Sequence, residues 1–334
     1  MTSVLNIENL KVTFATDAGD VPAVKDVSLT VAPGEVVAIV GESGSGKSVT
    51  AKTILGLLPE TAVARGAVIL GANNVIELSG ARLRAVRGTD VAMVFQEPST
   101  ALNPVYTVGW QIAEGLRAHG KYTKKQARAK AIEILGKVGI PDPKSRVDYY
   151  PHQFSGGQKQ RVVIAMALVL EPGLIVADEP TTALDVTVQA EILDLLRRLR
   201  EELGLAVIIV THDLGVIADL CDRAVVMYAG QVIEQGSVDT LLTTPTHPYT
   251  RALLASMPSN AIPGLPLDAI PGAVPAPRDW PEGCRFAPRC AFATDACRSA
   301  PVPIVVQHGG LSRCIRVDEV LAASQVRTKE RNIA

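Results

Sequence analysis

The chain carries the stretch Gly41-Glu42-Ser43-Gly44-Ser45-Gly46-Lys47-Ser48, which matches the phosphate-binding pattern G-x-x-x-x-G-K-S. Its glycines let the backbone turn tightly and point several N–H groups inward, where side chains would otherwise intrude. In this pattern the lysine neutralises the β- and γ-phosphates, and the following serine hydroxyl is placed to ligate Mg²⁺. The stretch therefore predicts a nucleoside triphosphate site centred on Lys47 and Ser48.

The sequence on either side of this loop supports the prediction. Residues 35–40 are predicted to form a short buried strand and residues 48–55 a helix. The loop then lies at a helix N-terminus, where the helix dipole and free N–H groups favour anions. This strand–loop–helix context argues against a glycine-rich turn that binds nothing. The predicted nucleotide-contacting residues of the loop are Gly41, Glu42, Ser43, Gly44, Ser45, Gly46, Lys47, Ser48 and Val49.

Length and composition indicate a soluble protein of one large or two modest domains. The chain has 334 residues, of which 47% are hydrophobic and only 4% aromatic, enough for a sizeable aliphatic core. The net charge of −1 gives no global field toward nucleic acid, and no run approaches the roughly 18 apolar residues of a membrane span. The first residues lack the layout of a secretion signal, and five cysteines beside such a loop suggest a reducing cytosol.

Further strands are predicted before and after the loop. Residues 4–31 show the spacing of antiparallel strands, residues 66–71 suggest another strand, and residues 90–95 suggest a buried one. Gln96 follows that buried strand, where ligand-facing residues of parallel sheets are found. Phe14 is one of the few aromatic residues; it is either part of the core or a stacking platform for an adenine ring.

Residues 97–172 are predicted to be a helical insertion within the nucleotide-binding sheet, because segments 110–119 and 124–138 show helical periodicity. The insertion ends at Phe154-Ser155-Gly156-Gly157-Gln158-Lys159-Gln160-Arg161. Ser155 is a natural N-cap, and Gly156 and Gly157 leave the first helical N–H groups uncovered. This predicts a second anion site that lacks a lysine of its own.

Two adjacent carboxylates end the predicted strand at residues 174–180. Asp178 suits an outer contact to Mg²⁺, and Glu179 can polarise an attacking water. Another buried strand is predicted at residues 206–211 and is followed by His212, which is placed to hydrogen-bond a γ-phosphate, although a lone histidine usually has a structural role.

The ordered motif set resembles that of an ATP-binding cassette (ABC) ATPase, over roughly residues 4–250. The matching motifs are the Walker A loop, Q-loop, signature, Walker B, D-loop and switch histidine: Gly41 to Ser48, Gln96, Ser155 to Gln158, Asp178-Glu179, Ala183-Leu184-Asp185 and His212. The resemblance implies an α/β fold of the P-loop NTPase class, with a mixed central sheet, an antiparallel β subdomain and an inserted α-helical subdomain. It also implies that Phe14 lies near the adenine and that Asp185 belongs to the nucleotide site.

This resemblance implies a head-to-tail pair of cassettes closing on two ATP molecules. Ser155, Gly156 and Gly157 of one cassette would then cap the γ-phosphate bound by the loop of the other. The resemblance implies that Glu179 is the general base. Lys47 and His212 would stabilise the charge of the phosphates. Contacts to Mg²⁺ and water would come from Ser48, Gln96 and Asp178.

A finer resemblance links the chain to the oligopeptide/dipeptide subgroup of bacterial importers, through residues 94–104, 246–254 and 283–292. It implies a peripheral ATPase at the cytoplasmic face of the cell membrane that powers peptide import with two permease subunits and an extracytoplasmic binding protein. A distinct second ATPase is favoured over a homodimer. The alternatives are an importer of a metal chelate or another small solute, and a non-transport cassette protein of DNA repair or translation. The expected division is a nucleotide-binding domain at 1–250, with its helical subdomain at 97–172, and an extension at 251–334.

The extension begins with a proline-rich connector at residues 258–281 and holds four cysteines: Cys284, Cys290, Cys297 and Cys314. The segment is short and poor in aliphatic residues, so we expect it to need a staple rather than a core of its own. Disulfides are disfavoured in the cytosol, and none of the gaps between the cysteines gives the paired knuckle usual for zinc. Iron–sulfur clusters occur in the subgroup that the chain resembles. A structural [4Fe–4S] cluster is therefore expected, with zinc or no metal as alternatives. Cys221 is expected to be a small buried hydrophobe.

Overall fold

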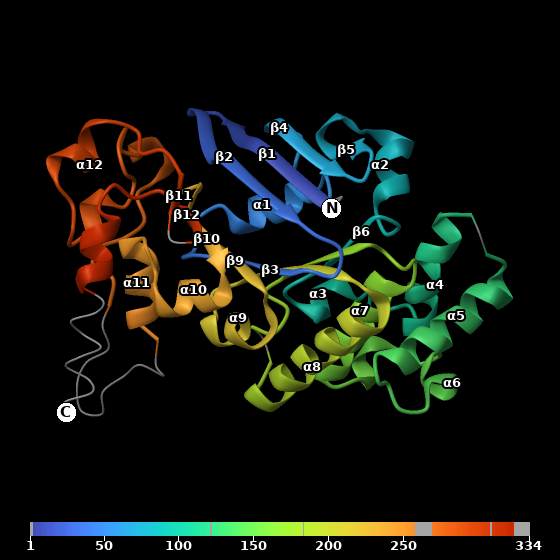
Figure 1. Ribbon diagram of the computed structural model, residues 1–334. Helices are drawn as coiled ribbons and strands as arrows, with labels where there is room; N and C mark the ends of the chain where they lie inside the picture. Colours follow the sequence, from blue (N-terminus) through green and yellow to red (C-terminus); the bar gives the residue numbers. More distant parts are fainter. Residues whose placement is uncertain (1–2, 121, 183, 258–268, 308, 324–334) are drawn as a thin grey trace, which may run out of the picture.

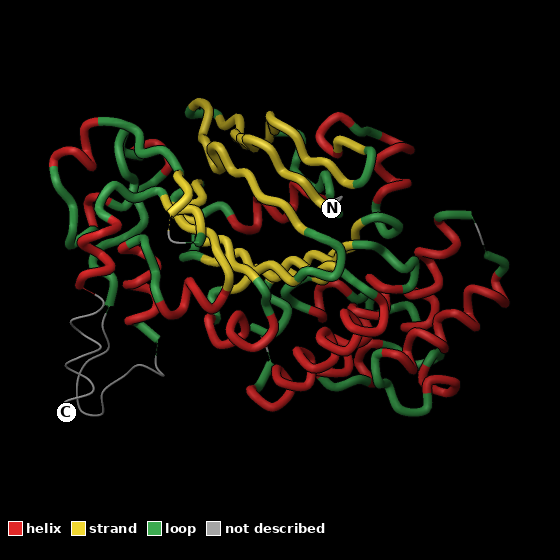
Figure 2. The backbone as a smooth tube through the Cα atoms, in the orientation of Figure 1, coloured by secondary structure: helices red, strands yellow, loops and turns green. Residues whose placement is uncertain are grey.

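The strand that precedes the phosphate-binding loop lies inside a parallel sheet. In the computed structural model, which describes residues 3–120, 122–182, 184–257, 269–307 and 309–323, strand β3 (Val36–Val40) is buried at every position. It pairs in parallel with β8 (Ala206–Thr211) and β9 (Arg223–Tyr228). Beyond β8 lie β7 (Leu174–Asp178) and β6 (Val91–Val94), also parallel. These continuous Val/Ile/Ala runs suit strands that are covered on both faces (Figure 2).

The other side of this sheet is antiparallel and includes two strands from the C-terminal extension. Strand β10 (Gln231–Ser237) pairs with β9, and the hairpin of β11 (Val305–Gln307) and β12 (Gly310–Ser312) adds to β10. Within the described residues the full order is β11-β12-β10-β9-β3-β8-β7-β6. The predicted mixed central sheet is confirmed.

A second, antiparallel sheet covers one face of the first. Its order is β2-β1-β4-β5, formed by β1 (Leu5–Thr16), β2 (Gly19–Val31), β4 (Ala62–Leu70) and β5 (Asn73–Asn74). Helix α1 (Lys47–Ile54), which starts at the loop, contacts strands of both sheets (Figure 1). The apolar faces of the two sheets and α1 share one core cluster, so α1 is fixed from both sides. This confirms the antiparallel strands predicted for residues 4–31.

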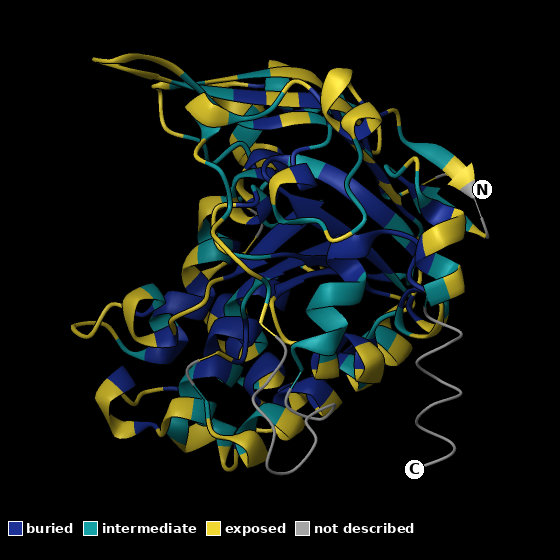
Figure 3. Ribbon diagram, turned by 90° about the vertical axis from the view of Figure 1, so that its left-hand side faces the viewer, coloured by how far each residue is buried: buried dark blue, intermediate teal, exposed yellow. Residues whose placement is uncertain are grey.

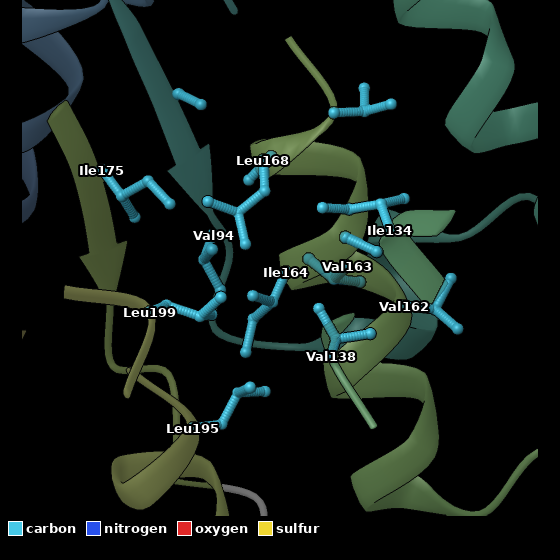
Figure 4. Packing of buried hydrophobic residues seen from close by; sticks show 14 of the residues in the cluster. Val94, Ile134, Val138, Val162, Val163, Ile164, Leu168, Ile175, Leu195 and Leu199 are labelled. Carbon is cyan, nitrogen blue, oxygen red and sulfur yellow. The ribbon is translucent and has the colours of Figure 1, made fainter. Parts of the chain in front are cut away.

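The predicted helical insertion packs beside β6 and β7. It consists of α3 (Pro98–Ala101), α4 (Val108–Ala118), α5 (Lys124–Lys137), α6 (Pro143–Arg146) and α7 (Gly156–Leu168). Figure 4 shows Val163 and Ile164 of α7 among apolar side chains of α5 and of α8 (Val186–Leu203), with Val94 and Ile175 of the sheet nearby. The core beneath the insertion therefore joins it to the strands that carry the predicted carboxylates.

The remaining helices are α2 (Gly80–Val86), α9 (Leu214–Leu220), α10 (Val238–Thr243), α11 (Pro248–Ala255) and α12 (Asp295–Ser299). Helix α11 runs without a break across the boundary expected at residue 250. Buried residues form the centre of the molecule and exposed ones its outer helices and hairpins (Figure 3). No helix among the described residues is long and apolar enough to cross a membrane.

The C-terminal segment does not stand apart as a stapled tail. Phe286 is 2% exposed and belongs to a core cluster with Tyr228 of β9 and Tyr249 of α11. The segment shares a core with the main body rather than building one of its own, because three aromatic rings form that core jointly. Part of the expected connector, including Pro258, Pro263 and Pro266, lies outside the described residues.

Candidate functional site: a nucleotide site at the strand ends

The glycine-rich loop folds as a cradle that only glycine fits at two positions. Gly41 has φ 151°, and a Cβ there would lie 2.1 Å from the Met227 carbonyl oxygen. Gly46 has φ 99° and is the N-cap of α1, with no side chain capping the helix. The first N–H groups of α1 are therefore left to an outside acceptor, as expected of a phosphate site.

Lys47 is a buried cation without a carboxylate partner. Its side chain is 7% exposed, and Nζ donates to the carbonyl oxygens of Gly41 (2.7 Å) and Glu42 (3.0 Å). Burial lowers the pKa of Lys47, which the nearby carboxylates of Glu179, Asp178 and Glu42 oppose. A buried ammonium at a helix N-terminus, bonded to carbonyls alone in the described structure, fits an anionic phosphate.

Two of the three predicted magnesium contacts, Ser48 and Asp178, lie together, whereas Gln96 bonds to Glu179. Ser48 Oγ donates to Asp178 Oδ1 at 3.3 Å, across the gap between α1 and the end of β7. Burial raises the pKa of Asp178, and the bond from Ser48 opposes that shift. A hydroxyl and a carboxylate are oxygen donors of the kind that Mg²⁺ prefers, so this pair fits the ion.

Glu179 is surrounded by three polar side chains. Its Oε2 accepts from Gln96 Nε2 at 2.8 Å and from Thr182 Oγ1 at 3.0 Å, and its Oε1 lies 3.2 Å from His212 Nδ1. Glu179 has φ 48°, a left-handed conformation rare for a non-glycine residue, and its N–H donates to the Val210 carbonyl of β8. The backbone is therefore held in a strained form that fixes the carboxylate.

These residues meet because their strands are neighbours. The loop follows β3, His212 follows β8, the two carboxylates end β7, and Gln96 follows β6, in the spatial order of the sheet. Side chains at the carboxyl ends of adjacent parallel strands share one edge, which is where such sheets bind ligands. Sequence reasoning missed Thr182 as a partner of Glu179; a hydroxyl in the turn after the paired acids was the available signal.

The predicted second anion site lies at the N-terminus of α7. Ser155 forms a reciprocal capping box with Gln158: its Oγ accepts from the Gln158 N–H, and its own N–H donates to the Gln158 side chain. Ser155 and Gly156 are exposed. A Cβ on Gly157 would lie 2.5 Å from Val188 Cγ1, so Gly157 lets α7 pack against the start of α8.

Asp185 and Phe14 were predicted to contact nucleotide, but neither lies at the edge of the sheet where the other site residues meet. Asp185 caps α8, its carboxylate accepting from the Val188 N–H at 3.0 Å. Phe14 lies on β1, partly buried against the core between the two sheets. Their contacts to nucleotide therefore stay predictions. Ala183 of the same motif lies outside the described residues.

Comparison with known proteins decides the family. Residues 24–182 match the ABC transporter family, and residues 233–297 match the C-terminal region of oligopeptide/dipeptide transporters. A peptide import ATP-binding protein of Brucella abortus (strain 2308) is 48% identical over 334 residues, covering 96% of this chain and 98% of its own length. The chain belongs to the ABC transporter family. Another relative of the same name, from Brucella suis biovar 1 (strain 1330), is 50% identical over 313 residues, covering 93% of this chain and 94% of its own.

Solved cassettes share the fold. A dimeric ATP-binding cassette in a post-hydrolysis state, bound to ADP and Pi, superposes with a TM-score of 0.62 at 32% identity, covering 70% of this chain and 98% of its own. A Clostridium perfringens protein described as part of an ABC transporter complex gives 0.62 at 31% identity, covering 72% and 91%. The chain is thus an ABC ATPase, and the predicted fold class is confirmed.

In this cassette the four C-terminal cysteines line one small cavity. The cavity, of about 20 Å³, is bordered by Cys284, Cys290, Cys297 and Cys314, together with His247, Arg313 and Arg316. Burial raises the pKa of Cys290 to about 11 and that of Cys314 to about 12. Among the described residues no group of three His, Cys, Asp or Glu side chains is arranged to hold a metal ion. Four thiols are the ligand type that binds iron–sulfur clusters, but they are not arranged around one, and the present space is that of about one water molecule. Cys221 packs partly buried against the core, as expected.

Proposed function

We propose that this ATPase powers peptide import as a subunit of an ABC transporter. The carrying observation is one chain that combines the Walker A loop and its neighbouring polar side chains with a segment, residues 233–297, that matches the C-terminal region of oligopeptide/dipeptide transporters. Relatives that cover nearly the whole chain and are named for peptide import support the same cargo. A metal chelate or another small solute is the alternative cargo. A non-transport role is disfavoured because the C-terminal match is to a transporter region.

We propose a task in hydrolysis for each polar side chain of the site, and the geometry supports these roles. Lys47 and the free N–H groups of α1 would hold the phosphates, and Ser48 and Asp178 would hold Mg²⁺, which supplies charge neutralisation when bound. Glu179 would accept the proton of the attacking water, with its carboxylate held in place by Gln96 and Thr182. His212, whose Nδ1 lies 3.2 Å from Glu179 Oε1, would stabilise the charge of the γ-phosphate.

The working unit is proposed to contain two cassettes. The exposed N-terminus of α7 lacks a lysine and would cap the phosphate held by a second cassette. A solved cassette that shares the fold is dimeric, which supports this arrangement. We favour a distinct second ATPase over a second copy of this chain. Two permease subunits and an extracytoplasmic binding protein complete the proposed complex, with this chain at the cytoplasmic face. Residues 1–250 would supply the cassette, residues 97–172 its helical subdomain, and residues 251–334 the extension.

Reconstitution tests the cargo and the composition together. The complex is purified through a tag on this chain, its subunits are identified by mass spectrometry, and it is placed in liposomes with its binding protein. Oligopeptides supplied on the side of the binding protein should raise ATP turnover and accumulate in the compartment that holds the ATPase, whereas metal chelates should do neither. Stimulation by a chelate alone would refute the peptide cargo. Two copies of this chain without another ATPase would refute the heterodimer.

We further propose that the four cysteines hold an iron–sulfur cluster. The charge beside the shared cavity also supports this: Arg313, which is partly buried, donates to the carbonyl oxygens of Val232 and Val302 and, among the described residues, forms no ion pair with an acid, whereas Arg316 pairs with Glu319 at 3.0 Å. A cation without an acidic partner favours an anionic occupant, and a cluster with four thiolates is an anion. The thiols would have to move apart to admit it. Anaerobic purification followed by iron, sulfide and zinc analysis tests this; protein with a folded C-terminal segment and neither iron nor sulfide refutes it.

A further inference from the structure

We propose that the C-terminal segment is a clamp on the phosphate-binding loop, with Arg289 positioning Glu42 so that nucleotide affinity depends on the cysteine-bearing segment. The inference rests on the proposed binding of nucleotide by this loop. Three independent contacts carry it, made by Arg289, by Tyr249, and by the pair Trp280 and Arg285. None of them was visible in the sequence, because the partners are far apart along the chain.

The first contact is a two-pronged ion pair. Arg289 Nη1 lies 2.7 Å from Glu42 Oε2, and Nη2 lies 3.1 Å from Oε1. The Arg289 side chain is only 6% exposed, and its Nε donates to the Pro271 carbonyl at 2.7 Å. Exposed ion pairs contribute little, but a buried, bidentate one fixes geometry, and removing one partner leaves an uncompensated buried charge.

The second contact grips the backbone of the same residue. The Glu42 N–H donates to the Tyr249 hydroxyl at 2.8 Å. Tyr249 is fully buried, and its ring lies 4.7 Å from that of Tyr228 and 5.3 Å from that of Phe286, which belongs to the cysteine-bearing segment. The cysteine-bearing segment therefore holds the Glu42 side chain directly through Arg289, and it supports the Glu42 backbone through Tyr249, a cassette residue against which Phe286 packs.

The third contact reaches the middle of the loop. The Gly230 N–H donates to the Ser45 carbonyl at 2.9 Å. The ring of Trp280 covers Gly230 so closely that a Cβ there would lie 2.6 Å from it, and Arg285 lies 3.6 Å above the Trp280 ring centroid. Arg285 also donates to the Ala229 carbonyl. The turn that holds Ser45 is thus covered by the extension.

These contacts bear on nucleotide because of what Glu42 supports. Lys47 donates to the Glu42 carbonyl, so the position of Glu42 sets that of the phosphate-facing ammonium. Arg289 is followed directly by Cys290, whose thiol lines the cavity of four cysteines. A change in that cavity therefore reaches the loop through a single peptide bond. Coupling of this kind is reciprocal: nucleotide must steady the cysteine segment by the same factor.

The test is calorimetric titration of the full chain with Mg-ADP, which the ATPase cannot hydrolyse. Arg289→Ala should raise the Kd about tenfold, within the usual range of couplings between sites. Arg289→Lys should fall between, because an ammonium keeps the charge but loses the two-pronged geometry. The matched control is Arg298→Ala in the same segment, which breaks only an exposed pair with Asp295 and should leave the Kd unchanged.

The outcomes separate the clamp from the site itself. Wild-type chain that binds no Mg-ADP would refute the loop as a nucleotide site. Normal wild-type binding with an unchanged Kd in folded Arg289→Ala would overturn the clamp alone. If Arg289→Ala does not fold, Glu42→Gln takes its place, because it removes the same charge pair from the other side; an unchanged Kd there would equally overturn the proposal.

A second readout does not depend on affinity. Hydrogen exchange followed by mass spectrometry should show amides in residues 284–290 exchanging more slowly when the wild-type chain is saturated with Mg-ADP. In Arg289→Ala that nucleotide-dependent protection should be lost, and in Arg298→Ala it should persist. A residue that merely stabilises the fold would change exchange equally with and without nucleotide. Absence of protection in the wild type would overturn the coupling.

Discussion

Two helix N-termini of this molecule face anions in opposite ways. The N-cap of helix α1 is Gly46, which has a left-handed conformation and no side chain to cap the helix. The first residue of the helix is the buried Lys47. Helix α7 starts at Ser155, whose capping box with Gln158 already satisfies two of its N–H groups, and lies exposed. The N-terminus of α1 has free N–H groups that need a ligand as their acceptor. The N-terminus of α7 is already capped by its own side chains, so it can contact a ligand only at its exposed surface.

The difference supports the proposal that the nucleotide site is built as two unequal halves. The α1 half holds charge, is buried by two sheets, and is clamped by the C-terminal segment. The α7 half brings glycine N–H groups with no lysine, as suits a surface that closes on phosphates already held elsewhere. Changes in the first half should therefore alter binding within one chain, whereas changes in the second should alter only the working complex.

The largest effect is expected at Glu179. Glu179→Gln should lower ATP turnover about a thousandfold, because it removes the general base while keeping the shape and the contact to Gln96. Nucleotide affinity should stay as in the wild type, and the ATP-bound pair should accumulate in the closed form. Steady-state turnover with a coupled assay checks the first, and size-exclusion chromatography in ATP the second. The control is Glu202→Gln, on the exposed side of α8, which should turn over ATP like the wild type. Turnover near the wild-type rate in Glu179→Gln would show that Glu179 is not the general base.

A smaller effect is expected at Lys47, which tests the α1 half alone. Lys47→Ala should weaken Mg-ADP binding by the isolated chain about thirtyfold, since a charge-assisted hydrogen bond contributes roughly 2 kcal/mol. Calorimetric titration measures it directly. Lys52→Ala, on the exposed side of the same helix, should bind like the wild type. Equal weakening by both changes would mean that general charge, not the cradle, holds the phosphates.

Ser155 tests the other half, with an effect of about tenfold. Ser155→Ala should lower turnover of the intact transporter by that factor, or ~1.4 kcal/mol in the barrier. Binding of Mg-ADP by the isolated chain should not change, because the α7 N-terminus lies apart from its own loop in sequence and contact. The cost to the fold is that of one N-cap, about 1 kcal/mol. If Ser155→Ala weakened binding by the single chain, the two halves would not be separate.

The smallest effect separates two neighbouring glycines of α7. Gly157→Ala should lower the free energy of unfolding by about 1 kcal/mol, because the added Cβ would meet Val188 at 2.5 Å. Gly156→Ala should change it by less than ~0.5 kcal/mol, since the nearest atom, on Leu184, is 3.8 Å away. Urea unfolding of the two variants gives the comparison. Equal gains in stability would show that helix propensity, which favours alanine over glycine, and not packing against α8, governs this end.

Most of the site could be predicted from the sequence, and its position follows from one physical rule. Each functional motif directly follows or ends an apolar run, and neighbouring parallel strands bring those ends to one edge. Gln96, Glu179 and His212 were therefore predicted together and lie together. Thr182 was missed, because a threonine in a turn has no spacing rule that links it to a carboxylate.

The C-terminal segment could not be predicted in the same way. Its contacts join residues such as Arg289 and Glu42, which no local periodicity connects. Its few aliphatic residues suggested a tail without a core, but Phe286 completes a core already begun by Tyr228 and Tyr249. Composition reports whether a segment can fold alone; it does not report whether a neighbouring surface offers the missing half.

Strand β12 has a consequence for how the protein is made. It closes the β10 edge of the large sheet, yet the ribosome synthesises it only after α10, α11 and the first three cysteines of the segment. Until then a nascent chain displays β10 as an open edge, the feature through which unfinished proteins join one another. Once β12 is in place, the outermost strand is the three-residue β11, too short to recruit another chain readily. Translation that stops before β12 should therefore yield aggregates and chaperone clients rather than a smaller working ATPase.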